Sequence, residues 1–212
     1  MYDDTGGNSM GTLENIHAWQ KEEGIRYFRT LGIKEGDSAA DYGCGTGLFT
    51  LPLSKACGDT GKVYGIDVKE ECCQALAETK RQENLVNVCV INASDESLDD
   101  IRQLDHVLLF DLLQDLGDEK AHVLKQCYAM LKEGGLLHIA MFTIHLPMED
   151  IEKSMKEVED FGFTCVRVLD EGGIHMNRYQ NHPETDIQVE DFERGPLYQF
   201  KKFSGYNPGK NT

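Results

Sequence analysis

The sequence lacks any apolar stretch close to the roughly 18 residues that a membrane-spanning helix needs. It also lacks the features of a signal peptide, because its first ten residues are acidic and glycine-rich rather than basic and then apolar. From these two absences we expect a cytoplasmic protein without a membrane partner.

Positive charge is scarce. The 212 residues include 21 Lys and Arg against 37 Asp and Glu, which gives a net charge of −16. The longest runs of basic residues are pairs, Lys80-Arg81 and Lys201-Lys202. Because such a surface repels phosphate backbones, we expect no nucleic acid partner. A compact chain with no second recognition domain favours a small-molecule partner, and a protein partner is the alternative.

The chain has seven cysteines, but no two of them have the C-x-x-C spacing of a metal site. An odd number without a framework indicates a reducing compartment, in which these thiols serve mainly as small hydrophobic side chains. His175 and His182 lie in polar sequence and are expected to be solvated. We therefore predict no metal site.

Strand-like and helix-like segments alternate along the chain, a pattern typical of a parallel sheet covered on both faces. The length fits one domain, so we predict a single α/β domain over residues 1–212 with a doubly wound, seven-stranded, mostly parallel sheet. The expected strands are 38–42, 62–68, 87–91, 105–110, 136–142, 163–169 and 197–203. The expected helices are 12–31, 46–57, 69–83, 118–131 and 148–161; Asp118 is the expected N-cap of the fourth, and Pro52 is expected to kink the second or mark its first turn.

The expected domain divides into residues 1–35 and a core with its closing strands, residues 36–212. Residues 1–35 form an N-terminal helical segment, and we expect its first twenty residues, with His17 and Trp19, to act as a lid. The alternative is a disordered tail followed by a helix that only packs on the sheet. The long connection 170–196 is an extended hairpin, a functional loop or a mobile segment.

The strongest local signal is Asp41-Tyr42-Gly43-Cys44-Gly45-Thr46-Gly47, between the first strand and the first core helix. Three glycines at alternate positions let the chain turn sharply and bring bare backbone close to a ligand. The dinucleotide fingerprint G-x-G-x-x-G would place its third glycine at position 48, where this chain has leucine. For this motif alone, a tight turn without a ligand remains the alternative.

Asp67 closes the second expected strand, 20 residues after Gly47. A carboxylate offers two neighbouring acceptor oxygens, which suit the two hydroxyls of a ribose. Taken alone, an Asp at a strand end is more often a turn residue. Next to a glycine-rich turn it predicts a ribose-containing ligand.

Four segments now carry a family resemblance. They are AADYGCGTGLFTL (39–51), VYGIDV (63–68), HVLLFDLLQDL (106–116) and YAMLKEGGLLHIAMF (128–142). In this order and spacing they resemble the class I S-adenosylmethionine-dependent methyltransferases. The resemblance implies S-adenosylmethionine as cofactor, methyl transfer as the reaction, and a last strand that is antiparallel and inserted between the fifth and sixth.

The resemblance also implies roles for the residues at the first strand. Asp41 would hold the amino group of the cofactor's methionine moiety, directly or through water. The turn would let its backbone approach the methionine moiety and ribose; its residues are Gly43, Cys44, Gly45, Thr46 and Gly47.

At the following strands, Asp67 would bind the ribose hydroxyls, and Val68 would lie against the adenine. The family often has an acidic residue where this chain has Ala93, so Asp95 or a backbone group near Ser94 is expected to serve instead. Phe110 and Asp111 would border the methionine moiety and the acceptor pocket.

Methyl transfer needs a general base only if the acceptor must first lose a proton. The candidates are His145, Asp111 and Asp115, each of which also fits a plain loop position. Two rival functions remain: a non-enzymatic module that binds the cofactor or a partner, and an NAD-dependent oxidoreductase, which Leu48 in place of glycine disfavours.

Overall fold

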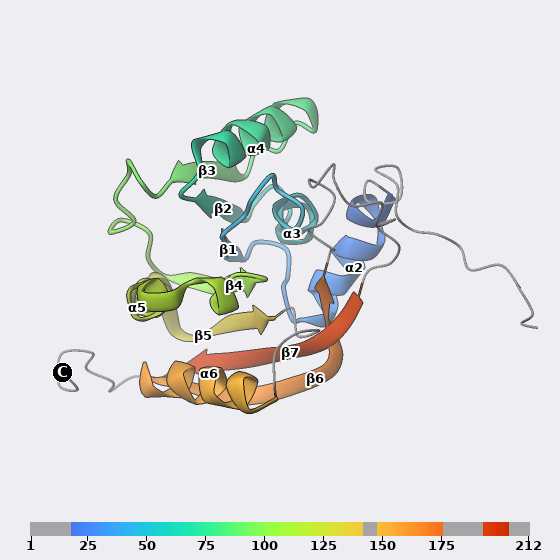
Figure 1. Cartoon of the computed structure of the whole chain (residues 1–212). Helices are drawn as coiled ribbons and strands as arrows, with labels where there is room; N and C mark the ends of the chain where they lie inside the picture. The colour runs from blue at the N-terminus through green and yellow to red at the C-terminus, as the bar shows by residue number, and fades with distance from the viewer. Residues whose placement is uncertain (1–17, 142–147, 176–192, 204–212) are drawn as a thin grey trace, which may run out of the picture.

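The computed structural model describes residues 18–141, 148–175 and 193–203 (Figure 1). Its strands form one seven-stranded sheet in the order β3-β2-β1-β4-β5-β7-β6. These strands are β1 (Ser38–Tyr42), β2 (Lys62–Asp67), β3 (Val88–Asn92), β4 (Leu104–Phe110), β5 (Leu131–Ala140), β6 (Phe163–His175) and β7 (Glu193–Lys202). β1 to β5 pair in parallel, whereas β7 pairs antiparallel with both β5 and β6. The expected fold and the inserted antiparallel strand are confirmed.

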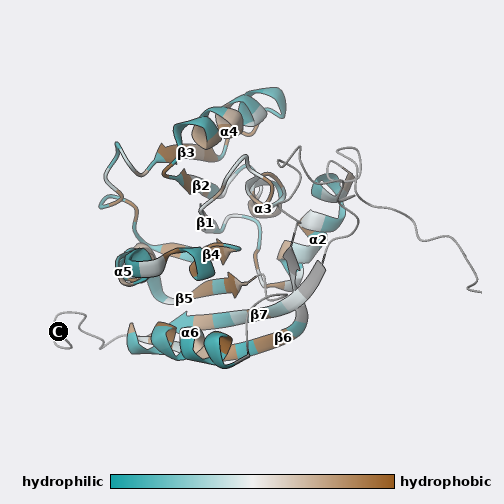
Figure 2. Cartoon of the chain, in the orientation of Figure 1, coloured by the Kyte–Doolittle hydropathy of each residue, from teal (hydrophilic) through white to brown (hydrophobic). Residues whose placement is uncertain are grey.

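Helices cover both faces of the sheet. They are α2 (Glu23–Thr30), α3 (Thr50–Cys57), α4 (Glu70–Gln82), α5 (Lys120–Met130) and α6 (Met148–Asp160), with 3-10 turns η1 (Leu113–Asp115) and η2 (Gly117–Glu119). One apolar cluster joins the sheet to α5 and α6, and the other joins it to α2 and α3. Leu108 belongs to the second cluster and its neighbour Leu109 to the first, so alternate residues of β4 serve opposite faces. Figure 2 shows the matching hydrophobic colour along the central strands.

Several boundaries differ from the expected ones. α3 begins at Thr50 rather than at position 46, because the glycine-rich turn continues through residue 49. The prediction of Asp118 as an N-cap is wrong: it lies within η2, and Glu119 precedes α5 without a side-chain cap bond. β5 begins five residues early, since Leu131 pairs with Leu104 before a register shift.

Both ends of the long connection 170–196 belong to the sheet. Gly173 pairs with Gly195 and His175 with Glu193, which favours an extended hairpin there. Residues 176–192, which include His182, lie outside the described residues, as do residues 1–17 and 142–147. Within the described ranges, no helix is both long and apolar enough to cross a bilayer.

Candidate functional site

The predicted ligand-binding residues follow the carboxyl ends of β1, β2, β3 and β4, which meet at one edge of the sheet. β1 lies between β2 and β4, so the strand order reverses at this point, where open α/β sheets bind ligands. The site residues brought to this edge are Asp41, the Gly43–Gly47 turn, Asp67, Val68, Ala93, Ser94, Asp95, Phe110 and Asp111. His145 and His17 lie outside the described residues.

The Gly43–Gly47 turn has a left-handed backbone at all three glycines, with φ of 80°, 52° and 94° at Gly43, Gly45 and Gly47. The N–H groups of Gly43 and Cys44 both donate to the Ile66 carbonyl, at 2.8 and 3.0 Å, which fastens the turn to β2. A Cβ on Gly47 would come within 2.6 Å of Leu76, whereas a Cβ on Gly45 would meet no described atom within 4 Å. Gly45 is therefore the position at which a ligand can approach bare backbone.

Asp41 is a buried carboxyl group, only 2% exposed. It accepts a hydrogen bond of 2.6 Å from the Thr50 hydroxyl. Burial raises its pKa to about 6; the Thr50 bond opposes this rise, and the charge of nearby Asp67 adds to it. A carboxylate in these surroundings is stabilised by a cationic ligand group.

Asp67 connects the tip of β2 to the glycine-rich turn. Its Oδ2 accepts the N–H of Gly45 at 2.9 Å, and its Oδ1 accepts the N–H of Lys69 at 3.0 Å. The Asp67 backbone carbonyl accepts the N–H of Ala93 at 2.8 Å. The carboxylate thus lies beside the half-buried backbone of Gly45, as a ribose-binding role requires.

The tip of β3 is tied to the same edge. The Ser94 hydroxyl donates to the Val68 carbonyl at 2.9 Å, while Asp95 accepts from the Asn92 amide at 3.1 Å. Val68 is 59% exposed, a large apolar side chain left uncovered beside Asp67. Exposed apolar surface at this point is compatible with a flat aromatic ligand such as adenine.

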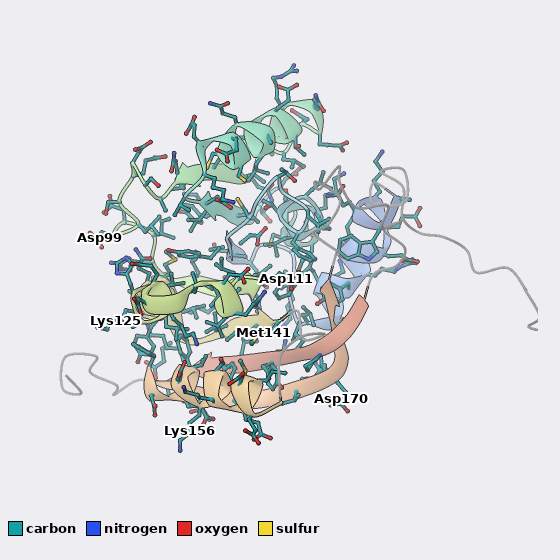
Figure 3. The ribbon with its side chains drawn as sticks, in the orientation of Figure 1. Asp99, Asp111, Lys125, Met141, Lys156 and Asp170 are labelled. Atoms are coloured by element: carbon teal, nitrogen blue, oxygen red, sulfur yellow. The ribbon has the colours of Figure 1, made fainter. Side chains whose placement is uncertain are left out.

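At the end of β4, the ring of Phe110 is 3% exposed and packs against Phe49, with ring centroids 5.0 Å apart. It therefore supports the strand end from the core. Asp111 follows with φ of 54°, an uncommon conformation outside glycine, and its N–H donates to the Ala140 carbonyl at 2.9 Å. Figure 3 shows Asp111 and Met141 at the neighbouring ends of β4 and β5. A residue held in a rare backbone conformation next to the glycine-rich turn fits a functional position.

The described end of the N-terminal segment contacts Leu48 and Phe49, the two residues that follow the Gly43–Gly47 turn. Trp19 is 3% exposed and packs edge-on against Phe49. The Gln20 side-chain amide donates to the Leu48 carbonyl at 3.0 Å. Sequence reasoning did not identify Gln20, and the proposed lid function of residues 1–20 stays a prediction because most of them lie outside the described residues.

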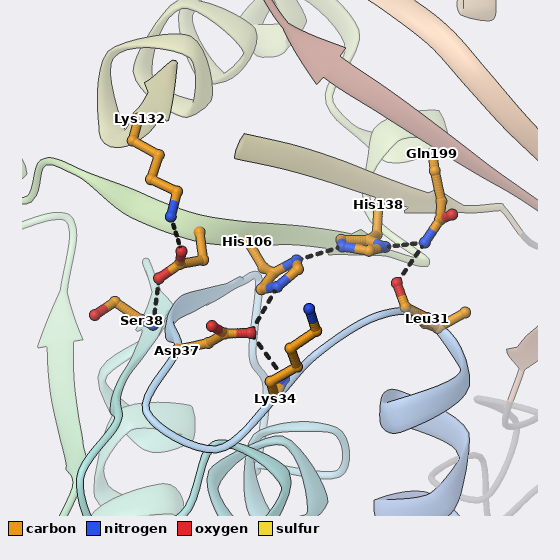
Figure 4. Close-up of polar contacts among 9 residues, drawn as sticks. Leu31, Lys34, Asp37, Ser38, His106, Lys132, His138 and Gln199 are labelled. Carbon is orange, nitrogen blue, oxygen red and sulfur yellow. Dashed lines mark hydrogen bonds and ion pairs between the residues drawn. The ribbon is translucent and has the colours of Figure 1, made fainter. Parts of the chain in front are cut away.

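Sequence reasoning also missed a buried polar chain on the α2 side of the sheet (Figure 4). The Gln199 amide nitrogen contacts both the Leu31 carbonyl, at 2.8 Å, and His138 Nδ1, at 3.1 Å. His138 Nε2 lies 3.0 Å from His106 Nδ1, and His106 Nε2 lies 3.1 Å from Asp37. Because the Gln199 nitrogen can only donate, each ring must accept on Nδ1 and donate from Nε2.

His106 and His138, the two histidines joined by these hydrogen bonds, are therefore both neutral. Burial lowers the pKa of each ring, and the Asp37 carboxylate opposes this effect at His106. His106 lies near the start of β4, in register with Ala39, so the chain lies away from the carboxyl ends where the candidate site is built. A histidine within an otherwise apolar strand was the available sequence signal.

The sequence also contains three Tyr-x-x-x-Lys spacings, which an NAD-dependent oxidoreductase could use: Tyr128 and Lys132, Tyr198 and Lys202, and Tyr206 and Lys210. The third pair lies outside the described residues, and Lys202 of the second donates to the Tyr128 and Leu131 carbonyls. The Tyr128 hydroxyl donates to the Phe203 carbonyl, and Lys132 pairs with Asp105 at the start of β4. These contacts hold Tyr128 and Lys132 at the amino ends of the parallel strands, away from the glycine-rich turn.

The cysteines match their expected structural role. All seven are free, and the buried ones are Cys44, Cys57, Cys73 and Cys127. Burial raises the pKa of the Cys57 thiol to about 12, which makes it a poor nucleophile. Within the part of the chain that the structure describes, no group of three or more His, Cys, Asp or Glu could hold a metal ion.

Part of the chain is similar in sequence to known proteins. Residues 39–135 match the sequence model of a family described as a methyltransferase domain. A demethylmenaquinone methyltransferase of Staphylococcus aureus is 31% identical over 130 residues, covering 61% of this chain and 52% of that protein. The chain thus spans about half the length of the curated relatives it matches.

Solved structures share the fold. A SAM-dependent methyltransferase from Aquifex aeolicus has a TM-score of 0.62 at 22% identity, covering 89% of this chain and 97% of that one. The cyclase SpnF has a TM-score of 0.64 at 16% identity, covering 88% of this chain and 84% of that one.

Proposed function

We propose that the chain, whose residues 39–135 match a methyltransferase-domain family, is a class I, S-adenosylmethionine-dependent methyltransferase that transfers a methyl group from this cofactor to a small molecule. The observation that carries the proposal is the joint placement of buried Asp41, the bare backbone of Gly45 and the Asp67 carboxylate at the strand-order reversal.

These residues fit the cofactor's chemistry. The cofactor carries an amino group and a sulfonium, both cationic, and the buried Asp41 carboxyl favours a cation beside it. Asp67 would accept from the ribose hydroxyls, and Val68 would cover one face of the adenine. The space beside Gly45 would admit the methionine moiety and ribose.

Bound S-adenosylmethionine would supply a methyl group on a positively charged sulfur, already activated for attack by a nucleophile. The protein's own contribution is then to align the acceptor with that methyl group and to exclude water. Our candidate for accepting a proton, from an acceptor that must lose one, is Asp111 at the end of β4, which is 7% exposed. His145 remains the other candidate for this role.

A small-molecule acceptor is supported by two observations. The net charge of −16 disfavours phosphate-rich partners. In addition, the matching Staphylococcus aureus relative is named for a small-molecule acceptor, demethylmenaquinone. We expect the acceptor of this chain to be an uncharged or cationic small molecule, because the acidic edge repels anions.

Calorimetry with S-adenosylmethionine, S-adenosylhomocysteine and NAD tests cofactor choice. We expect binding of the first two and none of NAD; binding of NAD alone would contradict the proposal. A transfer screen with methyl-labelled cofactor over a panel of metabolites then identifies the acceptor.

The same fold also supports other chemistry. The cyclase SpnF matches it as well as the methyltransferases do, so the fold by itself does not fix the reaction. A chain that binds S-adenosylmethionine and methylates nothing in the screen would instead be a cofactor-binding or partner-binding module.

A further inference from the structure

Helix α3 has a proline as its third residue, and this proline interrupts the hydrogen bonding of the first turn. The Leu51 N–H donates to the Gly47 carbonyl at 3.2 Å, and the Leu53 N–H donates to the Phe49 carbonyl at 3.0 Å. The intervening helical hydrogen bond would join the N–H of residue 52 to the Leu48 carbonyl. Residue 52 is a proline, so this N–H does not exist. The α3 sequence therefore leaves the Leu48 carbonyl without its helical donor.

Gln20 supplies a donor to this carbonyl from a distant part of the chain. Its Nε2 donates to the Leu48 carbonyl at 3.0 Å, across 28 positions of sequence. Gln20 is only 6% exposed, so water has little access to replace it. An unpaired carbonyl in such surroundings is costly, which makes the bond worth more than one at the surface.

Packing around Gln20 joins the N-terminal helical segment to the same turn of α3. The Trp19 ring lies edge-on to Phe49, with centroids 6.1 Å apart and planes at 85°. A Cβ on Gly24 would come within 2.9 Å of the Pro52 Cβ, so glycine lets α2 lie directly against the proline. The segment is thus docked where the helical bond is missing.

We propose that Gln20 is a positioning residue for the cofactor: it holds the Leu48 carbonyl in place of the absent Pro52 N–H and so fixes the Gly43–Gly47 turn. Leu48 directly follows Gly47, whose own carbonyl accepts the Leu51 N–H. A shift of the Leu48 carbonyl therefore moves the end of the turn that presents Gly45 to the ligand. This role rests on the proposed function, since the ligand is S-adenosylmethionine.

The test measures S-adenosylhomocysteine binding by calorimetry for matched variants. Gln20→Ala should raise the Kd about three- to tenfold, the effect of one lost hydrogen bond. Adding Pro52→Ala should return the Kd to within about twofold of wild type, because residue 52 then has an N–H for the Leu48 carbonyl. Alanine also keeps the Cβ that packs near Gly24. The same double change would also restore stability, so the positioning role requires that Gln20→Ala binds more weakly under conditions in which it is fully folded.

Two further variants control the experiment. Gln20→Met keeps the length of the side chain but offers no donor, so it should raise the Kd at least as much as Gln20→Ala. Gln82→Ala removes an exposed glutamine whose side-chain amide donates to Glu78 on α4, and it should leave the Kd unchanged. Circular dichroism and urea unfolding report whether each variant is folded.

The outcomes separate the two proposals. A wild-type protein that does not bind S-adenosylhomocysteine contradicts the proposed function itself. Wild-type binding by Gln20→Ala, or a double variant that stays as weak as Gln20→Ala, contradicts only the positioning role.

Discussion

The Asp41 carboxyl group lies at the end of β1, beneath the glycine-rich turn and near a second carboxylate. Its burial and the charge of Asp67 favour the protonated form, while the Thr50 hydroxyl favours the ionised form. The outcome is a pKa of about 6, so this group gains or loses its proton close to neutral pH. A ligand ammonium group at this position would favour the ionised carboxylate and lower that pKa.

We therefore predict that S-adenosylhomocysteine binds more tightly as the pH rises from about 5 to about 7, by up to about tenfold per unit below the pKa of free Asp41. Below that pKa the free protein must release a proton before it binds the cationic amino group. Calorimetry across this range measures the slope, and Asp41→Asn should flatten it. An equal slope in Asp41→Asn would show that another group titrates.

Replacement of Asp67 should affect the ribose end of the ligand. Asp67→Ala is expected to weaken cofactor binding by about 1–3 kcal/mol, because the hydroxyls lose a charged acceptor. Asp67→Asn keeps an oxygen that can accept the Gly45 N–H, so this variant should lose less cofactor-binding free energy than Asp67→Ala. Titration calorimetry measures both variants; an affinity unchanged in Asp67→Ala would remove this residue from the site.

Gly45 and Gly47 differ in what an added methyl group would meet. Gly45→Ala places its Cβ in open space. Its left-handed backbone should lower the free energy of unfolding by about 1–2 kcal/mol, and the main loss should be in cofactor binding. Gly47→Ala places its Cβ within 2.6 Å of Leu76 and should lower the free energy of unfolding instead. Urea unfolding and calorimetry separate the two effects. Normal cofactor binding by Gly45→Ala would contradict the backbone-approach argument.

At the scale of elements, hydrophobic pattern and turn residues predicted most of the sheet. β1 was expected at 38–42 from its position before the glycine-rich turn, and the structure gives the same bounds despite its weak strand composition. The start of α3 was misplaced because three left-handed glycines hold residues 43–47 outside the helix. The early start of β5 depends on pairing with β4 across a register shift, which no local pattern contains.

The candidate site was predictable where a motif lies within one segment, as with Asp41, Gly45 and Asp67. Contacts that join distant segments were not. Gln20 meets Leu48 only after α2 packs against α3, and Gln199 meets His138 only after β7 pairs with β5. The one local hint of the first contact is Pro52, which removes a helical donor.

The histidine pair that joins β4 and β5 predicts a stability that depends on pH. The pKa of each ring is lowered in the folded protein, so below the unfolded value of about 6.5 the unfolded chain takes up protons that the native protein does not. Stability is fully present above that pH and is lost as the pH falls, by up to about 1.4 kcal/mol per unit for each ring.

His138→Gln tests this prediction, because it removes one titrating ring. Urea unfolding at several pH values between about 5 and 7.5 should give a shallower slope for the variant than for the wild type. Asp41, whose pKa is raised, contributes a slope of opposite sign in both proteins and cancels in the comparison. Identical slopes would mean that His138 does not titrate in this range.

At the scale of the whole molecule, the excess of acidic residues gives an expectation about macromolecular substrates. With a net charge of −16, the chain should neither bind nor methylate RNA at about 0.1 M salt, because its excess negative charge repels the phosphate backbone. Filter binding and transfer of labelled methyl groups to total RNA measure this. Labelled RNA would contradict the small-molecule proposal directly.

The position of β7 in the sheet also has a consequence for how the chain reaches its native state. β7 lies between β5 and β6 although it follows both in sequence, and β6 has no other strand partner in the described sheet. Until residues 193–202 emerge from the ribosome, β5 and β6 each present an unpaired edge, and His138 lacks the Gln199 amide. Such edges template intermolecular pairing, so the nascent chain is most prone to aggregation just before its final strand is inserted.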